Sequence, residues 1–173
     1  MSDSDVRVPA TRADLFQLFT ALGIVSETFE HQAVFTVEEA RAVHALVPGL
    51  HCKNLFLKDA KGTLWLVVAP AEATIDLKTL HTRIGAKRLS FGSAALLFEV
   101  LGVEAGSVTP FALINDRDQR VKVVLDQGMM AAPLLNFHPL ANTASSTITP
   151  ADLIRFVESC GHVPRVIAVT TAS

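Results

Sequence analysis

The spacing of hydrophobic and polar residues predicts several helices along the chain. Three threonines stand just before apolar runs of helical period, each with an acidic residue three positions later: Thr11 with Asp14, Thr36 with Glu39, and Thr149 with Asp152. Such pairs satisfy free amide groups of the first helical turn and complement the helix dipole. A helix is therefore expected after each threonine, and two more are expected over residues 75–84 and 93–101.

Strand patterns lie between these helices. Residues 51–59 and 63–69 are rich in Leu, Val, Phe and Trp and flank a short polar turn, which predicts a β-hairpin. Residues 111–115 and 120–126 predict a second hairpin around the turn at 116–119, and further strands are expected at 134–138 and 165–170. We therefore expect an α/β (α+β) fold with a mixed, largely antiparallel sheet and helices packed on it.

Length and composition narrow the class of protein. The chain has 173 residues, half of them hydrophobic and 18% charged, which suits one globular domain over residues 11–170 after a flexible N-terminus at 1–10. The net charge of −2 argues against a protein that coats nucleic acid by bulk electrostatics. No apolar run is long enough for a membrane span, and residues 1–10 lack the apolar core of a signal peptide. We therefore expect a cytoplasmic protein without a membrane partner.

Neither a metal site nor a strong nucleophile is indicated. None of the six histidines belongs to a His-Glu-x-x-His motif, and the two cysteines lack a Cys-x-x-Cys spacing, so we expect no metal or other cofactor. The Gly-x-Ser-x-Gly motif of serine hydrolases is missing. Ser107 has no base near it in sequence, and Cys52 is expected to be a small core residue.

Three segments carry unusual polar residues. Residues 106–110, Gly-Ser-Val-Thr-Pro, form a loop in which a glycine of positive φ could aim successive backbone amides at one point, as an oxyanion site requires. On the residues alone, an ordinary helix-to-strand connection is the favoured interpretation. Lys53 shares a strand face with Leu55 and Leu57, so it either extends its ammonium to water or grips a phosphate. Residues 136–143 combine His138 with amide and hydroxyl side chains, which is also compatible with ordinary turn chemistry.

Together and in this order, these segments resemble the YbaK/ProX-type aminoacyl-tRNA editing domains, which also occur as the insertion domain of bacterial prolyl-tRNA synthetases. The matching stretches are Lys-Asn-Leu-Phe-Leu-Lys at 53–58, Gly-Ser-Val-Thr-Pro-Phe at 106–111, and Phe-His-Pro at 137–139 followed by Asn-Thr at 142–143. The resemblance covers nearly the whole chain. It is greatest to the free-standing branch that removes alanine from tRNA for proline.

This resemblance implies hydrolysis of the ester between an amino acid and the terminal ribose, assisted by a hydroxyl of the substrate and without a metal. By the same resemblance, the catalytic residues are Lys53, Gly106, Ser107, Val108, Thr109 and His138, and the substrate-binding residues are Asn54, Pro110, Asn142, Lys58 and Arg88. The loop amides would hold the ester carbonyl, and Lys53 would hold the terminal phosphate or ribose. Lys58 and Arg88 would meet the acceptor stem. The implied partners are a mischarged tRNA and prolyl-tRNA synthetase.

Two other functions remain open on the sequence: a non-catalytic module that binds tRNA, other nucleic acid or a synthetase, and a serine hydrolase that uses Ser107. For an editing pocket, rejection of proline by size needs a bulky wall. The candidates for this wall are Val37, Val43, Phe111 and Leu113.

Overall fold

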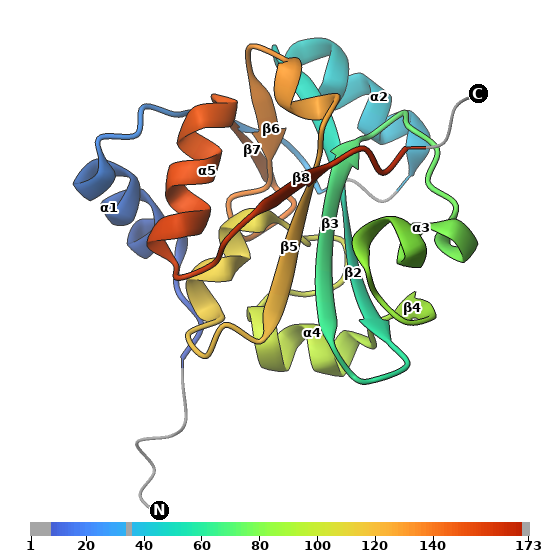
Figure 1. Ribbon diagram of the computed structural model, residues 1–173. Helices are drawn as coiled ribbons and strands as arrows, with labels where there is room; N and C mark the ends of the chain where they lie inside the picture. Colours follow the sequence, from blue (N-terminus) through green and yellow to red (C-terminus); the bar gives the residue numbers. More distant parts are fainter. Residues whose placement is uncertain (1–7, 34–35, 171–173) are drawn as a thin grey trace, which may run out of the picture.

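The computed structural model describes residues 8–33 and 36–170. These residues form a mixed β-sheet with helices on both faces (Figure 1). The helices of this part are α1 (Arg12–Leu22), α2 (Val37–Leu46), α3 (Leu77–Ile84), α4 (Ala94–Leu101) and α5 (Pro150–Ser159). The strands are β1 (Glu27–Glu30), β2 (Leu50–Asp59), β3 (Leu64–Pro70), β4 (Leu89–Phe91), β5 (Val121–Asp126), β6 (Leu135–Phe137), β7 (Ala144–Ile148) and β8 (Arg165–Ile167). Two short 3-10 helices also lie in the described part of the chain, η2 (Pro110–Asn115) and η3 (Met129–Ala131).

The three predicted helix starts are confirmed. Thr11 and Thr36 each form a reciprocal capping box with the acidic residue three positions later. Thr149 accepts a hydrogen bond from the amide of Asp152, and a proline follows it at the first helical position. The sequence pattern therefore located these helix starts because the capping bonds are local.

The strands pair in the order β1-β7-β6-β2-β3-β5-β8, with β4 added beside β2. Four pairs are antiparallel, including the predicted β2–β3 hairpin, whose register runs from Cys52 opposite Pro70 to Lys58 opposite Leu64. Three pairs are parallel: β2 with β6, β3 with β5, and β5 with β8. The mixed sheet is thus confirmed, and its parallel pairs join segments far apart in the chain.

The predicted second hairpin is wrong. Residues 110–115 form the buried helix η2, because Thr109 caps its start and Pro110 occupies its first position. The following turn is held by Asp116, whose buried carboxylate accepts hydrogen bonds from the amides of Arg120 (3.0 Å) and Val121 (2.9 Å) and contacts Nε2 of His162 at 2.8 Å. β5 then pairs in parallel with β3 instead of folding back on residues 111–115.

Alternation along β2 and β3 separates two hydrophobic cores. Phe56, Leu66 and Val68 face the larger core, which α1, α4, α5 and η2 cover. Leu57 and Trp65 face the smaller core, which α3 covers (Figure 1). Each residue of β2 therefore points either toward the α1–α5 side or toward the α3 side.

The predicted N-terminal tail lies largely outside the described residues. At its described end, the amide of Ala10 donates a hydrogen bond to Oδ1 of Asn115 at 2.8 Å. No helix of the described part is long and apolar enough to span a bilayer.

Candidate active site

A small cavity lies where the first half of β2 meets α2, β6 and the start of β7. Its volume is about 240 Å³, and its lining is rich in imidazole and amide groups. The lining residues are His31, Ala40, Val43, His44, His51, Cys52, Asn54, Ala71, Asn136, Phe137, His138 and Ser145. The sequence-predicted residues Asn54 and His138 are thus brought together from segments 84 positions apart.

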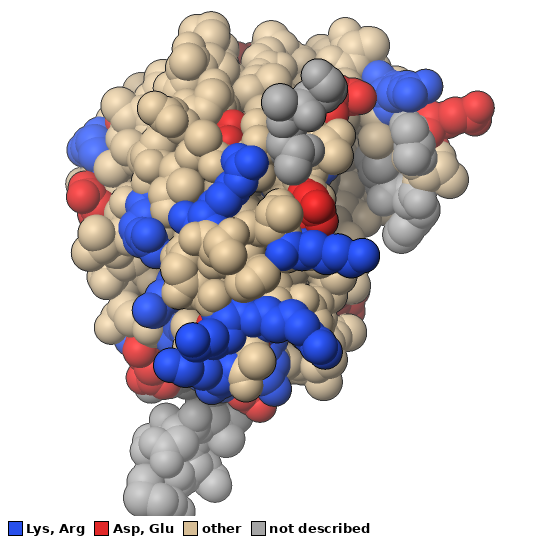
Figure 2. Space-filling model, turned by 45° about the vertical axis from the view of Figure 1, so that its right-hand side comes forward, with Lys and Arg blue, Asp and Glu red and all other residues tan. Residues whose placement is uncertain are grey.

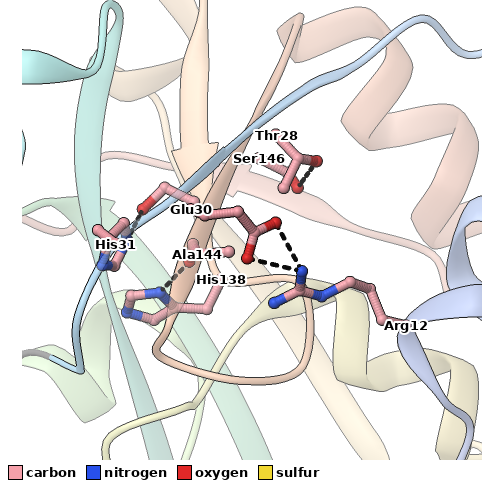
Figure 3. Close-up of polar contacts among 8 residues, drawn as sticks. Arg12, Thr28, Glu30, His31, His138, Ala144 and Ser146 are labelled. Carbon is pink, nitrogen blue, oxygen red and sulfur yellow. Dashed lines mark hydrogen bonds and ion pairs between the residues drawn. The ribbon is translucent and has the colours of Figure 1, made fainter.

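His138 is held in one orientation by its backbone neighbour across the turn. Its Nδ1 lies 2.9 Å from the carbonyl oxygen of Ala144, which can only accept, so Nδ1 carries the proton (Figure 3). Nε2 therefore presents a lone pair. Burial lowers the pKa of His138 from 6.5, against the smaller opposing effect of the Ala144 carbonyl, and nearby His31 and His51 lower it further. At neutral pH this side chain is a neutral hydrogen-bond acceptor.

His31 is fixed beside His138 by the register of β1 and β7. Its backbone amide donates to the carbonyl of Thr143 at 2.8 Å, and its Nε2 lies 2.9 Å from Oγ of Ser145. Its Nδ1 faces the carbonyl of Gln32 at 2.8 Å, and because a carbonyl can only accept, Nδ1 carries a proton. The ring centres of His31 and His138 are 6.3 Å apart (Figure 3).

A second pair of histidines occupies the other side of the cavity. The rings of His44 and His51 stack with their centres 4.0 Å apart and planes inclined by 18°. Burial is the main cause that lowers the pKa of each ring, and the proximity of the two rings lowers that of His44 further. Two protonated rings at this distance would repel each other. The stack is therefore stable when at least one ring is neutral.

Asn54 provides a second free acceptor. It lies on the face of β2 that contacts the larger core, and its Oδ1 is buried without a hydrogen-bond partner among the described residues. A buried acceptor without a hydrogen-bond partner lowers the unfolding free energy by about 1–3 kcal/mol. A ligand that donates a hydrogen bond at this position would remove that penalty.

Lys53 points to the opposite face, as predicted from its alternation with Leu55 and Leu57, which pack in the smaller core. Its ammonium donates to the carbonyl of Ala73, in the segment that leaves β3 toward α3. Lys53 and Asn54 thus diverge, and Lys53 is not part of the cavity wall. Two of its three ammonium donors remain available to a ligand at the cavity edge.

The loop at 106–110 lies beside the segment that His138 begins. Gly106 has φ +94°, as predicted, and a side chain there would come within 3.7 Å of Nδ2 of Asn142. The amide of Ser107 donates to the carbonyl of Glu104, so this member of the predicted amide row is already engaged. Within the described residues, the amides of Gly106, Val108 and Thr109 have no backbone partner.

The remaining predicted residues fall into two groups. Pro110 is buried at the start of η2, next to the cap formed by Thr109, so it shapes the end of the loop. Lys58 and Arg88 are exposed at the far end of β2 and just before β4, well beyond the cavity lining. Ser107 is itself buried, and no titratable side chain is bonded to it in the described part of the chain.

Of the four candidates for a bulky wall, Val43 lines the cavity. Phe111 and Leu113 are buried in the larger core, where Phe111 packs edge-to-face behind the cavity residue Phe137 with ring centres 5.7 Å apart. The side chain of Val37 lies outside the described part of the structure.

Sequence reasoning missed the histidines at 31, 44 and 51 and the polar residues that orient them. One usable signal was the run Ser145-Ser146-Thr147, because three buried hydroxyls in one strand need partners. Those partners are His31, Thr28 (2.7 Å) and Asn136 (2.6 Å), respectively. Figure 3 shows the contact between Thr28 and Ser146. It also shows the ion pair between Arg12 of α1 and Glu30 of β1, which connects these two elements.

The cavity holds neither a reactive thiol nor a metal-binding cluster. Burial raises the pKa of Cys52 to about 12, so its thiol stays protonated and is a poor nucleophile. Among the described residues, no three His, Cys, Asp or Glu side chains are placed to hold a metal ion. What the cavity offers is hydrogen-bond acceptors and neutral imidazoles.

Comparison with known proteins identifies the family of the chain. The family model "Aminoacyl-tRNA editing domain" matches residues 31–156. The prolyl-tRNA synthetase associated domain-containing protein 1 of Danio rerio is 38% identical over 91% of this chain and 86% of its own length. The prolyl-tRNA editing protein ProX of Acetoanaerobium sticklandii is 37% identical over 80% of this chain and 85% of its own.

The fold is shared as well. A crystal structure described as a candidate trans-editing enzyme for prolyl tRNA synthetase superposes with a TM-score of 0.68, covering 92% of this chain and 98% of the other at 19% identity. The family match spans the four cavity histidines, 31, 44, 51 and 138, and the loop at 106–110. The chain therefore belongs to the YbaK/ProX-type family of aminoacyl-tRNA editing domains.

Proposed function

We propose that this protein is a trans-editing deacylase that hydrolyses the ester of alanine on tRNA for proline within the histidine-lined cavity. The observation that carries the proposal is a pair of acceptors in the same small cavity, Nε2 of His138 and Oδ1 of Asn54, for which the described residues provide no hydrogen-bond donor. The family name and that of the relative ProX support tRNA editing in general.

Two lone-pair acceptors suit a small ligand that donates hydrogen bonds. The α-ammonium group of an esterified amino acid is such a donor, with three N–H bonds to distribute. Hydrogen bonds to a charged donor are worth about 1.5–3 kcal/mol each. His138 and Asn54 would thus fix the amino acid and aim its carbonyl toward the cavity mouth.

The chemistry then needs a water molecule and a place for the oxyanion. Water forms a bond to the carbonyl carbon, the bond from that carbon to the ribose oxygen breaks, and a proton passes to the leaving ribose oxygen. The neighbouring ribose hydroxyl would place the water, which replaces a protein nucleophile. The amides of Gly106, Val108 and Thr109 are the donors proposed to hold the developing oxyanion. No step requires a metal ion.

Lys53 is proposed to hold the terminal phosphate or ribose at the edge of the cavity. Its ammonium is anchored to Ala73 and keeps donors for an anionic ligand. Asn142, beside Gly106, is proposed to position the loop against the ribose end.

Cavity size supports alanine as the amino acid. A volume of about 240 Å³ is below the 300–1,000 Å³ of typical ligand pockets, and Val43 restricts it from α2. A synthetase pocket built for proline discriminates weakly against smaller residues, at about 1–3 kcal/mol per missing methylene. A second, smaller site removes this error by admitting alanine and excluding proline. The proposed setting is the cytoplasm, with prolyl-tRNA synthetase as a partner.

A deacylation panel tests the proposal. Purified protein with EDTA present should release alanine from alanyl-tRNA of the proline type and leave prolyl-tRNA intact, with cysteinyl- and seryl-tRNA as further substrates. Many turnovers per protein molecule separate an enzyme from a binding module, which would only saturate. If no aminoacyl-tRNA is hydrolysed at high protein concentration, the proposal fails.

A further inference from the structure

A further cavity lies at the β5–β8 end of the sheet, away from the candidate active site. Its volume is about 310 Å³, and it lies between the turn before β5, the first half of β5 and the loop from α5 to β8 (Figure 1). Its lining combines three valines with Gln119, Lys122, His162 and Arg165. Within the described part of the chain it shares no lining residue with the histidine-lined cavity, so the two are separate.

The first half of β5 has an open edge on this side. β3 pairs with β5 from Val121 onward, whereas β8 pairs with it only from Val124 onward. The amide of Gln127 donates to the last carbonyl of β8 at 3.0 Å, away from β3. The backbone groups of every second strand residue point to the same side, so the amide of Val123 also points away from β3.

This amide needs an acceptor. Among residues 8–33 and 36–170, neither a β8 residue nor another backbone carbonyl lies opposite the amide of Val123. Val123 is buried and lines the cavity. A buried backbone amide without an acceptor is rare in folded proteins, and the open edge of a sheet is a template for pairing with another chain. A carbonyl supplied from the open side would complete the edge.

The walls of the cavity are joined to each other by buried polar contacts. Asp116, in the turn before β5, lies 2.8 Å from Nε2 of His162, in the loop before β8. Burial raises the pKa of Asp116, but its hydrogen bonds lower it by more, so Asp116 is a carboxylate and Nε2 donates to it. The side-chain amide of Gln119 adds a bond to the carbonyl of Cys160 at 3.4 Å. Walls that are fixed before a ligand arrives lower the entropic cost of binding it.

Two cations lie on one face of the open edge. Lys122 stands opposite Trp65 in the register of β3 and β5, and its ammonium lies 5.3 Å from the centre of that ring. Arg165 stands opposite Val124 and donates to the carbonyl of Ile84, at the end of α3, at 2.8 Å. Trp65 and Val124 both pack in the smaller core, so the two cations lie on the α3 side of the sheet.

The surroundings of these cations favour a negatively charged partner. Neither Lys122 nor Arg165 forms a salt bridge with a described residue. Figure 2 shows Lys and Arg side chains gathered on the face that carries α3 and β4, with few acidic side chains among them. Val163, at the rim of the cavity, is 82% exposed. An occupant therefore gains from carboxylates beside the cations and from apolar side chains beside the valines.

We propose that the edge groove, defined as Val121, Lys122, Val123, Val163 and Arg165, binds an extended acidic segment of a partner protein as an added strand. A carbonyl of the segment accepts from the amide of Val123. Neighbouring residues of a strand point to opposite faces, so alternating side chains place carboxylates beside the cations and apolar groups beside the valines. In such complexes main-chain bonds provide affinity and the alternating side chains provide specificity. The edge groove is separate from the histidine-lined cavity, so this binding is independent of the proposed function.

Binding is measured by calorimetric titration with the blocked peptide acetyl-Val-Glu-Val-Glu-Val-amide. The double variant Lys122→Met, Arg165→Met should weaken binding about 4- to 25-fold, from about two- to fivefold for each exposed ion pair, while methionine keeps the aliphatic part of each side chain. A peptide with glutamine in place of both glutamates should show the same loss on the wild-type protein. Lys78→Met is the matched control, because Lys78 is exposed on α3 but does not line the cavity.

Amide hydrogen exchange tests the strand addition itself. At about 90% occupancy by the peptide, exchange at the amide of Val123 should slow about tenfold, because only the free protein exchanges there. The amide of Gln127 already donates to β8, so its exchange should not change. Unchanged exchange at Val123 in the presence of bound peptide would overturn the strand addition.

The remaining outcomes distinguish other occupants of the groove. No binding of the acidic peptide, an equal loss in Lys78→Met, or displacement of the peptide by an equal concentration of glutarate would overturn the proposal, the last by showing a simple carboxylate site. A dimer in sedimentation that the double variant converts to a monomer would also overturn it, in favour of a second copy of the chain. The double variant should deacylate alanyl-tRNA at the wild-type rate. Absence of deacylation by the wild type would overturn the proposed function alone, and the peptide titration would still decide the groove.

Discussion

Replacement of His138 by asparagine should separate the two roles that the structure gives this side chain. The imidazole Nδ1 donates to the carbonyl of Ala144 at 2.9 Å, and Nε2 is left as an acceptor facing the cavity. The side-chain amide of asparagine has its nitrogen near the position of Nδ1. His138→Asn can therefore keep the bond to Ala144 while it removes the acceptor. His138→Ala removes both.

The expected magnitudes follow from these two bonds. Loss of the acceptor to a charged ammonium group should cost about 1.5–3 kcal/mol in transition-state binding, which is a roughly 10- to 150-fold fall in kcat/KM. The asparagine variant should lose less than about 1 kcal/mol of unfolding free energy, because the Ala144 carbonyl stays satisfied. The alanine variant should lose about 1–3 kcal/mol, because that carbonyl is then left without its partner.

Single-turnover deacylation of alanyl-tRNA gives the first quantity, and urea unfolding of the same preparations gives the second. The two variants should be similarly slow but differ in stability. An asparagine variant that deacylates within threefold of the wild type would refute the assignment of Nε2 as a substrate acceptor. Equal stability of the two variants would refute the structural role of the Ala144 bond.

Four further changes test other parts of the structure. Gly106→Ala should lower the unfolding free energy by about 1–2 kcal/mol, because its backbone has positive φ, and should slow deacylation. Gly23→Ala is the control: it also has positive φ, with open space around it, and should lose similar stability at unchanged activity. Urea unfolding and deacylation assays compare the two variants. Lys53→Met should lower kcat/KM at least about tenfold and cost about 0.5–1.5 kcal/mol of unfolding free energy through the lost bond to Ala73, and full activity would exclude the lysine from the mechanism. Burial lowers the pKa of His138 below 6.5, so kcat/KM should be retained as the pH falls past 6.5 and be lost only in more acid solution, which a pH–rate profile measures. The unfolding free energy should already fall below pH 6.5, because His138 of the unfolded chain takes up a proton there before His138 of the folded protein does. Asp116→Asn should lower the unfolding free energy by about 2–4 kcal/mol. Burial raises the pKa of Asp116, but its hydrogen bonds lower it by more, so the wild type should lose this stabilisation as the pH falls below 3.8. Thermal unfolding of the two proteins across pH measures the cost of the substitution and its pH dependence.

The sequence predicted what depends on neighbours in the chain. The capping pairs of α1 and α2 each span three residues, and the β2–β3 hairpin closes over a short turn. The side of β2 that each residue faces also followed from alternation, which placed Lys53 with Leu55 and Leu57. Positive φ at Gly106 was predictable for the same reason, since the loop chemistry is local.

The missed features depend on contacts between distant segments. β7 lacks the apolar pattern of a strand, because three of its five residues carry hydroxyl groups that satisfy partners on β1, β6 and the segment after β1. Residues 111–115 have the apolar composition of a strand, but the cap at Thr109 and the burial of residues 110–113 favour η2. Periodicity cannot distinguish a buried strand from a buried short helix.

The residues of the sequence motifs and the residues that line the cavity are only partly the same. The motif residues Lys53 and Asn54 are adjacent in sequence, yet the strand turns them to opposite faces, so only Asn54 lines the cavity. The histidines at 31, 44 and 51 belong to none of the segments that carried the resemblance, but they line the same cavity as His138. Burial is the main cause that lowers the pKa of His138, and His31 and His51 lower it further. Removal of one such neighbour should therefore raise the pKa of His138 and shift the acid limb of the pH–rate profile upward. His31→Gln is the direct test, because glutamine can keep a hydrogen bond to Ser145 without a titrating ring; an unshifted acid limb would show that burial alone holds His138 neutral.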